Sequence, residues 1–440
     1  MPNPPHLLLI LVVFLSTHCN LVSTTTTTTC EACTPEALDH LLSLDPSSST
    51  TKFFSMSFAK KCADPSVPFH IKMSIGEQLA SHGQHDASYH LYAATTASIP
   101  KKDLKELKIR TAVMAKQIGK YQTCIQILSS DNVQLNDAFE YGLLAACQHR
   151  LHRSDDARLT HVQAVAHGAY PSHDPLRPGG GQEWEKNLVG KSLWTKKDLL
   201  ALDKGKGKSI VHIMNAMEDQ SNDIRDEMKT YMEVVAGTTS TGMISSGTTS
   251  SEWRLEKQNL SSKDDGWSEL YLYQNGALDE DICVMFPFTC SILRQAKFDL
   301  HPQGHVKFSK ISLGTHVWPH SGGSNTKLRG HLGVIVPKVA RRHAKLLIGE
   351  KIVRWKEGSV FLFDDTFEHA VDYGSNRGGG GEEGKGKGKG GVGEEEGEEE
   401  TRRERKEDRI VLIFDVFHPD VKRSKRIEMR RRNKRKDNEK

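Results

Sequence analysis

Two stretches of the chain carry histidines where a metal site could form. Residues 318–337 place His320 and His331 on either side of a Gly/Ser/Asn turn, and the apolar, β-branched run that follows is typical of a turn entering a strand. Residues 359–363 read as another strand, which ends in two carboxylates, and His369 follows. Neutral imidazoles at strand ends suit iron or zinc, and these stretches lack the clustered thiolates of a structural zinc site. The pattern therefore indicates a metal site.

The usual third metal ligand is missing from this pattern. An iron oxygenase commonly binds Fe(II) through two histidines and a carboxylate, which lies two residues after the first histidine. In this chain that position is Gly322. Either the histidines are ordinary packed or solvated side chains, or two histidines hold the metal and water fills the vacant position.

Three motifs, WPHSGGSNTKLRGHLG, FDDTFEH and RIVLIFDVFHP, together resemble the catalytic domain of the aspartyl/asparaginyl β-hydroxylases. Members of this family are 2-oxoglutarate oxygenases in which a glycine replaces the metal-binding carboxylate, as Gly322 does here. The resemblance covers residues 191–420, and the motifs occur in the family's order. It implies that the domain requires Fe(II), 2-oxoglutarate and O2.

The resemblance also implies roles for the polar residues that bind metal and co-substrate. His320 and His369 would be the iron ligands, and Ser309 would give 2-oxoglutarate a hydroxyl donor. Arg409 would bind the far carboxylate of 2-oxoglutarate, because a guanidinium presents paired donors to a carboxylate. His331 would lie near the carboxylates of the co-substrate or substrate.

Four further assignments concern the surroundings of the metal. Arg329 would also lie near those carboxylates, with an ordinary surface ion pair as the alternative, and Lys327 would face substrate or only water. Asp365 would hold an iron-bound water or orient an imidazole, unless it merely terminates a strand. The resemblance implies a disulfide between Cys283 and Cys290.

Residues 374–408 interrupt the resemblance. They contain a glycine run, alternating Gly and Lys, a Glu block and a basic cluster, a composition that cannot bury a core. We therefore expect a solvent-exposed disordered insertion, which the barrel can tolerate because closure entropy grows slowly with loop length. The insertion places Arg409 40 residues after His369, much farther than the family's pattern.

The N-terminal residues predict entry into the secretory pathway. Residues 7–15 form a nine-residue apolar run, so we assign 1–24 to a signal peptide or signal anchor. If uncleaved, residues 7–23 would anchor the chain in a membrane. A spacer and N-terminal segment, residues 25–73, contains a CxxC at Cys30, for which a local disulfide or no function is the expectation. The predicted location is the lumen or membrane of the endoplasmic reticulum, or outside the cell, where disulfides form.

Residues 74–169 have helical periodicity and three similar turns at spacings of 36 and 34 residues, beginning at Gly83, Gly119 and Arg153. This period is typical of tetratricopeptide-like repeats, whose helical pairs must stack to bury their apolar faces, and an arbitrary helical bundle is the alternative. The Pro- and Gly-rich segment at 170–190 is the expected linker.

The remaining chain predicts helices at 194–232, a loop at 237–251 and then short strands at 266–276, 306–313, 331–336, 352–355, 359–363 and 409–417. Many short strands with few helices favour an antiparallel jelly-roll or cupin-like double-stranded β-helix. The predicted fold class is therefore α+β and multidomain, with helical repeats before the β domain.

Charge is nearly balanced over the 440 residues, with a net charge of +4, but residues 421–440 hold eleven Lys/Arg against three acids. We read this basic tail as solvated or as a weak contact with an anionic surface, and expect no nucleic-acid partner. Two functions remain open. One is an oxygenase that hydroxylates Asp or Asn of a protein substrate; the other is a catalytically inactive scaffold whose helical repeats bind a partner.

Overall fold

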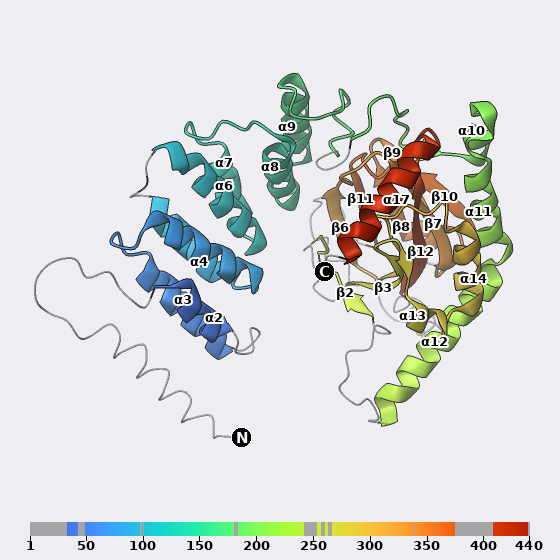
Figure 1. The fold of residues 1–440 in the computed structure, drawn as a ribbon, viewed down its shortest axis with the longest axis horizontal. Coiled ribbons are helices and arrows are strands. Elements are labelled where there is room, and N and C mark those ends of the chain that lie inside the picture. The colour runs from blue at the N-terminus through green and yellow to red at the C-terminus, as the bar shows by residue number, and fades with distance from the viewer. Residues whose placement is uncertain are drawn as a thin grey trace, which may run out of the picture. The chain divides into compact units, whose positions relative to one another are not determined.

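The computed structural model describes residues 33–42, 49–96, 99, 101–179, 184–241, 253–256, 260–262, 266–338, 340–374 and 408–438. They divide into two compact units, Met1–Thr160 and His161–Lys440 (Figure 1). The predicted signal segment, residues 1–24, lies outside the described residues, and so does the predicted insertion apart from its two end residues. In the described part of the chain, no helix is long and apolar enough to cross a membrane.

The first unit is helical. From α4 to α8 each helix packs against the next, and the turns at Gly83 and Gly119 adopt positive φ angles of 74° and 75°, which glycine tolerates without strain. The three turns predicted from the sequence separate α4 from α5, α6 from α7 and α8 from α9. The helices are α2 (Pro35–Leu42), α3 (Ser49–Cys62), α4 (Phe69–Ser81), α5 (His85–Thr95), α6 (Lys101–Gln117), α7 (Tyr121–Leu128) and α8 (Ala138–Arg150), and the unit ends within α9 (Ser154–Ala166).

Two disulfides crosslink this unit. Cys33 pairs with Cys62 and Cys124 pairs with Cys147. The expectation of a local CxxC disulfide at Cys30 is therefore wrong, because Cys33 is brought to the end of α3 and bonds there. The Cys124–Cys147 disulfide was not predicted from the sequence.

The second unit contains two antiparallel sheets. The larger has eight strands in the order β1-β10-β7-β12-β5-β3-β2, with β4 paired to β3, and the smaller has the order β6-β11-β8-β9. The strands are β1 (Leu193–Trp194), β2 (Arg254–Leu255), β3 (Trp267–Gln274), β4 (Ala277–Leu278), β5 (Val306–Ile311), β6 (Thr315–His320), β7 (Lys327–Ile335), β8 (Ala344–Ile348), β9 (Lys351–Val353), β10 (Val360–Phe363), β11 (His369–Tyr373) and β12 (Arg409–Phe417).

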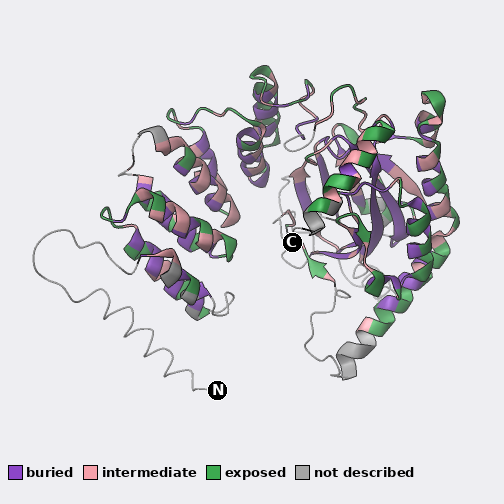
Figure 2. Cartoon of the chain, viewed as in Figure 1, coloured by how far each residue is buried: buried purple, intermediate pink, exposed green. Residues whose placement is uncertain are grey.

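Most strand residues of both sheets are buried (Figure 2). Because side chains alternate along a strand, they contribute to two cores. On β12, Leu412 and Phe414 join a core shared with the helices, whereas Val411 and Ile413 join a core that contains residues of both sheets. The helices of this unit are α10 (Lys196–Leu200), α11 (Lys208–Asp219), α12 (Ser221–Thr241), α13 (Glu280–Cys283), α14 (Pro287–Ala296), α15 (Ala340–His343) and α17 (Arg423–Asn438), with a 3-10 turn at Asp203–Gly205.

Several sequence expectations change in this unit. The predicted strand at 331–336 begins at Lys327, because the polar residues before His331 continue the ladder instead of forming the turn. Helix α12 runs through the first five residues of the predicted loop at 237–251, and the basic tail contains α17. Strands β1, β2, β4, β6, β8 and β11 were not predicted. The α+β fold class is confirmed, and Cys283 forms the expected disulfide with Cys290.

Candidate functional site

The two histidines proposed as metal ligands lie side by side on the smaller sheet. His320 ends β6, His369 begins β11, and the two residues are direct partners in the antiparallel ladder. Their ring centroids are 4.2 Å apart. The register shifts immediately after this pair, and such irregularities redirect side chains beside functional sites. The structure thus brings together two imidazoles that are 49 residues apart in the sequence.

Backbone hydrogen bonds orient both rings in the same way. His320 Nδ1 lies 2.8 Å from the Trp318 carbonyl oxygen, and His369 Nδ1 lies 2.9 Å from that of Phe367. A carbonyl only accepts, so each Nδ1 carries the proton and each Nε2 keeps its lone pair. Burial lowers the pKa of His320, and burial together with His320 lowers the pKa of His369 to about 3. Both imidazoles are therefore neutral near pH 7, as metal ligands must be.

A carboxylate occupies the space that Gly322 leaves. A Cβ atom added to Gly322 would lie 2.5 Å from Asp365 Oδ1, and the Gly322 amide donates to the Asp365 carbonyl oxygen at 2.6 Å. Asp365 Oδ1 is buried and has no hydrogen-bond partner among the described residues. The carboxylate absent from position 322 is thus replaced in space by one from the loop before His369.

We predict that Gly322→Ala weakens Fe(II) binding by roughly 10- to 100-fold, the usual effect of displacing a group that supports a metal ligand. The added methyl group would clash with the Asp365 carboxylate and displace it. For the same steric reason Gly322→Asp should not rebuild a working three-ligand set. Gly323→Ala is the matched control, because a Cβ there meets nothing within 4 Å. Equal Fe(II) affinities of the two alanine variants, measured by anaerobic titration, would contradict the steric argument.

Cations beside the histidines are neutralised by carboxylates. Lys327 contacts Asp365 Oδ2 and lies 3.9 Å from Asp415 Oδ2, and only 11% of its side chain is exposed. Arg329 forms a two-pronged pair with Asp415, at 2.8 and 3.0 Å, and lies 3.3 Å from Asp365 Oδ2. Burial alone would raise the pKa of Asp365, but Lys327 and Arg329 outweigh it and lower that pKa. Asp365 is therefore an anion at neutral pH.

Arg409 differs from these cations. It is 1% exposed, and its Nε and Nη1 atoms have no partner among the described residues. Its guanidinium lies over the ring of Trp355, 4.1 Å from the centroid, and burial lowers its pKa to about 9. An uncompensated buried charge is costly. The buried, unpaired nitrogens of Arg409 are therefore suited to binding an anion.

Polar groups surround this guanidinium. Ser309 lies diagonally across the β5–β12 ladder from Arg409, and its Oγ accepts from Trp267 Nε1 at 3.0 Å. Trp355 donates to His331 Nδ1 at 3.2 Å, which leaves the buried His331 Nε2 without a partner in the described structure. Burial, and then the charge of Arg409, hold the pKa of His331 well below its usual value.

Aromatic contacts connect the anion site to the metal site. The ring of His331 lies 5.2 Å from that of Phe363, which lies 5.4 Å from the ring of His369. A dicarboxylate with one end on Arg409 and the other near the two histidines matches the charges available. Two neutral imidazoles, an unpaired carboxylate oxygen and an unpaired guanidinium together fit an iron and 2-oxoglutarate site.

Sequence reasoning did not identify three groups that shape this site. Asp415 neutralises Arg329, Trp355 covers Arg409, and Trp267 fixes the Ser309 hydroxyl. Asp415 had a usable signal, since it is a lone carboxylate inside the apolar run IVLIFDVF, and a buried carboxylate needs a partner. The two tryptophans had no comparable signal, because aromatic residues in strands usually only pack.

Known proteins match the part of the chain that holds most of this site. Residues 218–377 match the family model described as aspartyl/asparaginyl beta-hydroxylase. The human aspartyl/asparaginyl beta-hydroxylase is 41% identical over 119 residues, 26% of this chain and 15% of that protein. The human aspartate beta-hydroxylase domain-containing protein 2 is 26% identical over 162 residues, 36% of each chain. The Rhizobium tropici ornithine lipid ester-linked acyl 2-hydroxylase is 30% identical over 108 residues, 24% of this chain and 37% of that protein.

The range of the family model, 218–377, contains the two histidines and Gly322 and ends before Arg409. They span a minor part of each relative, 15% of the human and mouse aspartyl/asparaginyl beta-hydroxylases. Within this range the match and the geometry agree: residues 218–377 are similar to the aspartyl/asparaginyl β-hydroxylase family, and they contain the adjacent histidine pair.

Proposed function

We propose that this protein is an Fe(II)/2-oxoglutarate-dependent dioxygenase that hydroxylates the β-carbon of aspartyl or asparaginyl residues in protein substrates. The proposal rests on the presence, in one domain, of two kinds of group. Two neutral histidines, His320 and His369, lie side by side, and the buried guanidinium of Arg409 has no anionic partner in the described structure. The family match supports the same chemistry.

The residues of the site would have different binding roles. His320 and His369 would hold Fe(II), and Arg409 with Ser309 would bind the far carboxylate of 2-oxoglutarate. The bound iron would supply O2 activation coupled to oxidative decarboxylation of 2-oxoglutarate. His331 would donate through Nε2 to a carboxylate or carbonyl oxygen, and its low pKa means that it would do so as a neutral ring.

Asp365 would hold a water molecule next to the metal. Among the described residues, Asp365 Oδ1 is the only buried carboxylate oxygen without a hydrogen-bond partner. It lies beside Gly322, where the usual carboxylate ligand is missing. An anion there replaces the charge of the missing ligand and disfavours chloride, so hydroxylation is favoured over halogenation. Lys327 and Arg329 keep Asp365 ionised. Because both of these cations contact carboxylates, Arg409 is the cation that would bind the co-substrate.

The finer architecture belongs to the same proposal. The two facing antiparallel sheets would form a double-stranded β-helix, with the histidine pair at the edge of the smaller sheet. Helices α4 to α9, with similar turns at a 34- to 36-residue period, would form tetratricopeptide-like repeats that help to bind substrate. Three disulfides support a location in the secretory pathway.

The inactive-scaffold alternative finds less support. A domain that had lost turnover would have no need to keep a buried, unpaired arginine, since an apolar residue there would stabilise the fold. Disulfide-containing and reduced peptides that carry Asp or Asn, incubated with the protein, Fe(II), 2-oxoglutarate and O2, test the proposal by mass spectrometry. A gain of one oxygen on an Asp or Asn residue supports it. Succinate formation without any oxidised peptide would overturn the substrate assignment.

A further inference from the structure

Residues 172–179 lie against the loop that joins Asp365 to His369. The amide of Gly179 donates to the Thr366 carbonyl oxygen at 3.1 Å, and the amide of Glu368 donates to the Leu176 carbonyl oxygen at 2.9 Å. Hydrogen bonds in both directions hold the two segments together like neighbouring strands. Residues 172–179, which belong to the linker predicted from the sequence, therefore pack against the loop that carries Asp365. We call this loop, residues 364–369, the metal loop.

Arg177 makes the strongest contacts between the two segments. Its Nη2 lies 2.7 Å from Asp364 Oδ2, and its Nε donates to Thr366 Oγ1 at 2.8 Å. Arg177 is 6% exposed and Asp364 is fully buried, so this charge pair is shielded from water. The guanidinium also lies over the rings of Trp184 and Phe367, at 4.7 and 5.5 Å from their centroids. These contacts fix the residues on both sides of Asp365.

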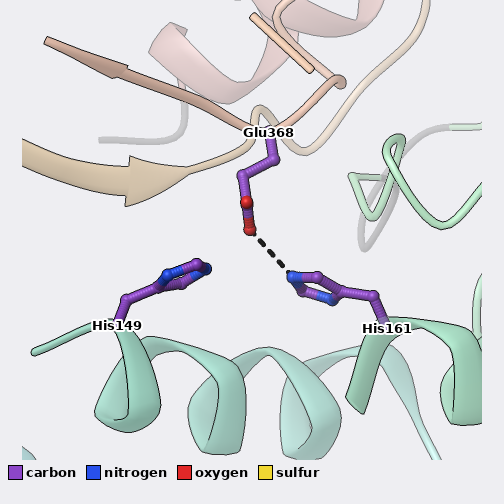
Figure 3. Close-up of side chains that lie close together, drawn as sticks. All are labelled: His149, His161 and Glu368. Carbon is purple, nitrogen blue, oxygen red and sulfur yellow. Dashed lines mark hydrogen bonds and ion pairs between the residues drawn. The ribbon is translucent and has the colours of Figure 1, made fainter. Parts of the chain in front are cut away.

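Two more contacts tie this part of the chain to the site. A Cβ atom added to Gly179 would overlap the Gly322 carbonyl oxygen, so the segment directly backs the position where the carboxylate ligand is missing. His161 Nε2 lies 2.8 Å from Glu368 Oε2 (Figure 3), and Glu368 directly precedes His369 in the sequence. The other ring nitrogen of His161 lies 2.6 Å from the Tyr170 hydroxyl. The metal loop is therefore held near both of its ends, by Arg177 at Asp364 and by His161 at Glu368.

We propose that Arg177 is a positioning residue of the metal site, which holds the metal loop so that Asp365 and His369 face His320. The inference rests on the proposed function and adds to it a residue outside the range that the family model matches, 218–377. Arg177 would touch neither metal nor substrate. It would act through Asp364 and Thr366, which lie on either side of Asp365.

The test uses the full chain with Arg177 replaced by Ala or Lys. We expect Arg177→Ala to lower Fe(II) affinity by roughly 10- to 100-fold and to increase hydrogen–deuterium exchange in the metal loop of the metal-free protein. Arg177→Lys should keep part of the affinity, because it retains the charge but loses the two-pronged geometry. Millimolar guanidinium should restore Fe(II) binding to Arg177→Ala, which a general loss of stability would not allow.

Arg225→Ala is the matched control. Arg225 pairs with Glu357 at 2.7 Å in the same unit, and neither residue belongs to the metal loop. If Arg177→Ala does not fold, Thr366→Val removes the acceptor of Arg177 Nε and should reproduce a smaller loss of Fe(II) affinity. Unchanged Fe(II) affinity in these variants, or an equal loss in Arg225→Ala, would overturn the inference. A wild-type protein that binds no Fe(II) would instead overturn the proposed function.

Discussion

Arg409→Leu is expected to stabilise the metal-free protein and to weaken 2-oxoglutarate binding strongly. The wild-type guanidinium is 1% exposed with two unpaired nitrogens among the described residues, so its removal should raise the free energy of unfolding by ~1–3 kcal/mol. In a domain of this size that corresponds to a rise in melting temperature of about 2–4 °C per kcal/mol. The affinity for 2-oxoglutarate should fall by about 30-fold or more, the effect of removing one partner of a buried charge pair.

A second buried arginine gives the control for this prediction. Arg177 is 6% exposed but is paired with Asp364, so Arg177→Leu leaves a carboxylate buried without its partner and should destabilise the metal-free protein by about 3–5 kcal/mol. Thermal unfolding of both variants and isothermal titration with 2-oxoglutarate measure the effects. A destabilised Arg409→Leu protein would mean that Arg409 already has a partner, and the argument for an anionic co-substrate would lose its main support.

His320→Ala and His369→Ala are each expected to lower Fe(II) affinity by more than about 100-fold and to leave the fold intact. The proposed ligand set holds only these two imidazoles, so the loss of either leaves too few donors. Each ring is neutral and accepts no proton near pH 7, so its removal leaves no buried charge behind.

His316→Ala is the control for the histidine pair. His316 lies on the same strand as His320 and packs against Trp318, with ring centroids 4.7 Å apart, but it is not part of the pair. Circular dichroism should show folded protein for all three variants, and anaerobic Fe(II) titration should separate His316→Ala from the other two. Wild-type Fe(II) affinity in His369→Ala would exclude the proposed ligand set.

The sequence was most informative where a local pattern is strong. The apolar, β-branched run 409–417 predicted β12 with its exact bounds, and the alternation in 266–276 predicted β3. Strand β6, THVWPH, escaped prediction because it is short and carries two histidines and a proline. The beginning of β7 was read as a turn, because its Lys and Arg look solvated until the carboxylates that neutralise them are known.

The candidate site divides in the same way. His320, Gly322 and His369 could be singled out from motifs, because the types and spacing of a few residues near each other carried the signal. Their mutual placement follows from the pairing of β6 with β11, which only the three-dimensional ladder shows. The contact of Arg177 with Asp364 joins residues 187 positions apart, and no local pattern marks either one as a partner.

Anaerobic titration of the full chain with Fe(II) and 2-oxoglutarate, followed by visible absorbance, is the decisive test of the proposed metal and co-substrate site. We expect a metal-to-ligand charge-transfer band that requires both additions and saturates at one equivalent of each. The band should be absent from His369→Ala and should need far more 2-oxoglutarate in Arg409→Leu. A wild-type protein without the band, or equal bands in wild type, His369→Ala and Arg409→Leu, would contradict the assignment of His369 and Arg409 to metal and co-substrate.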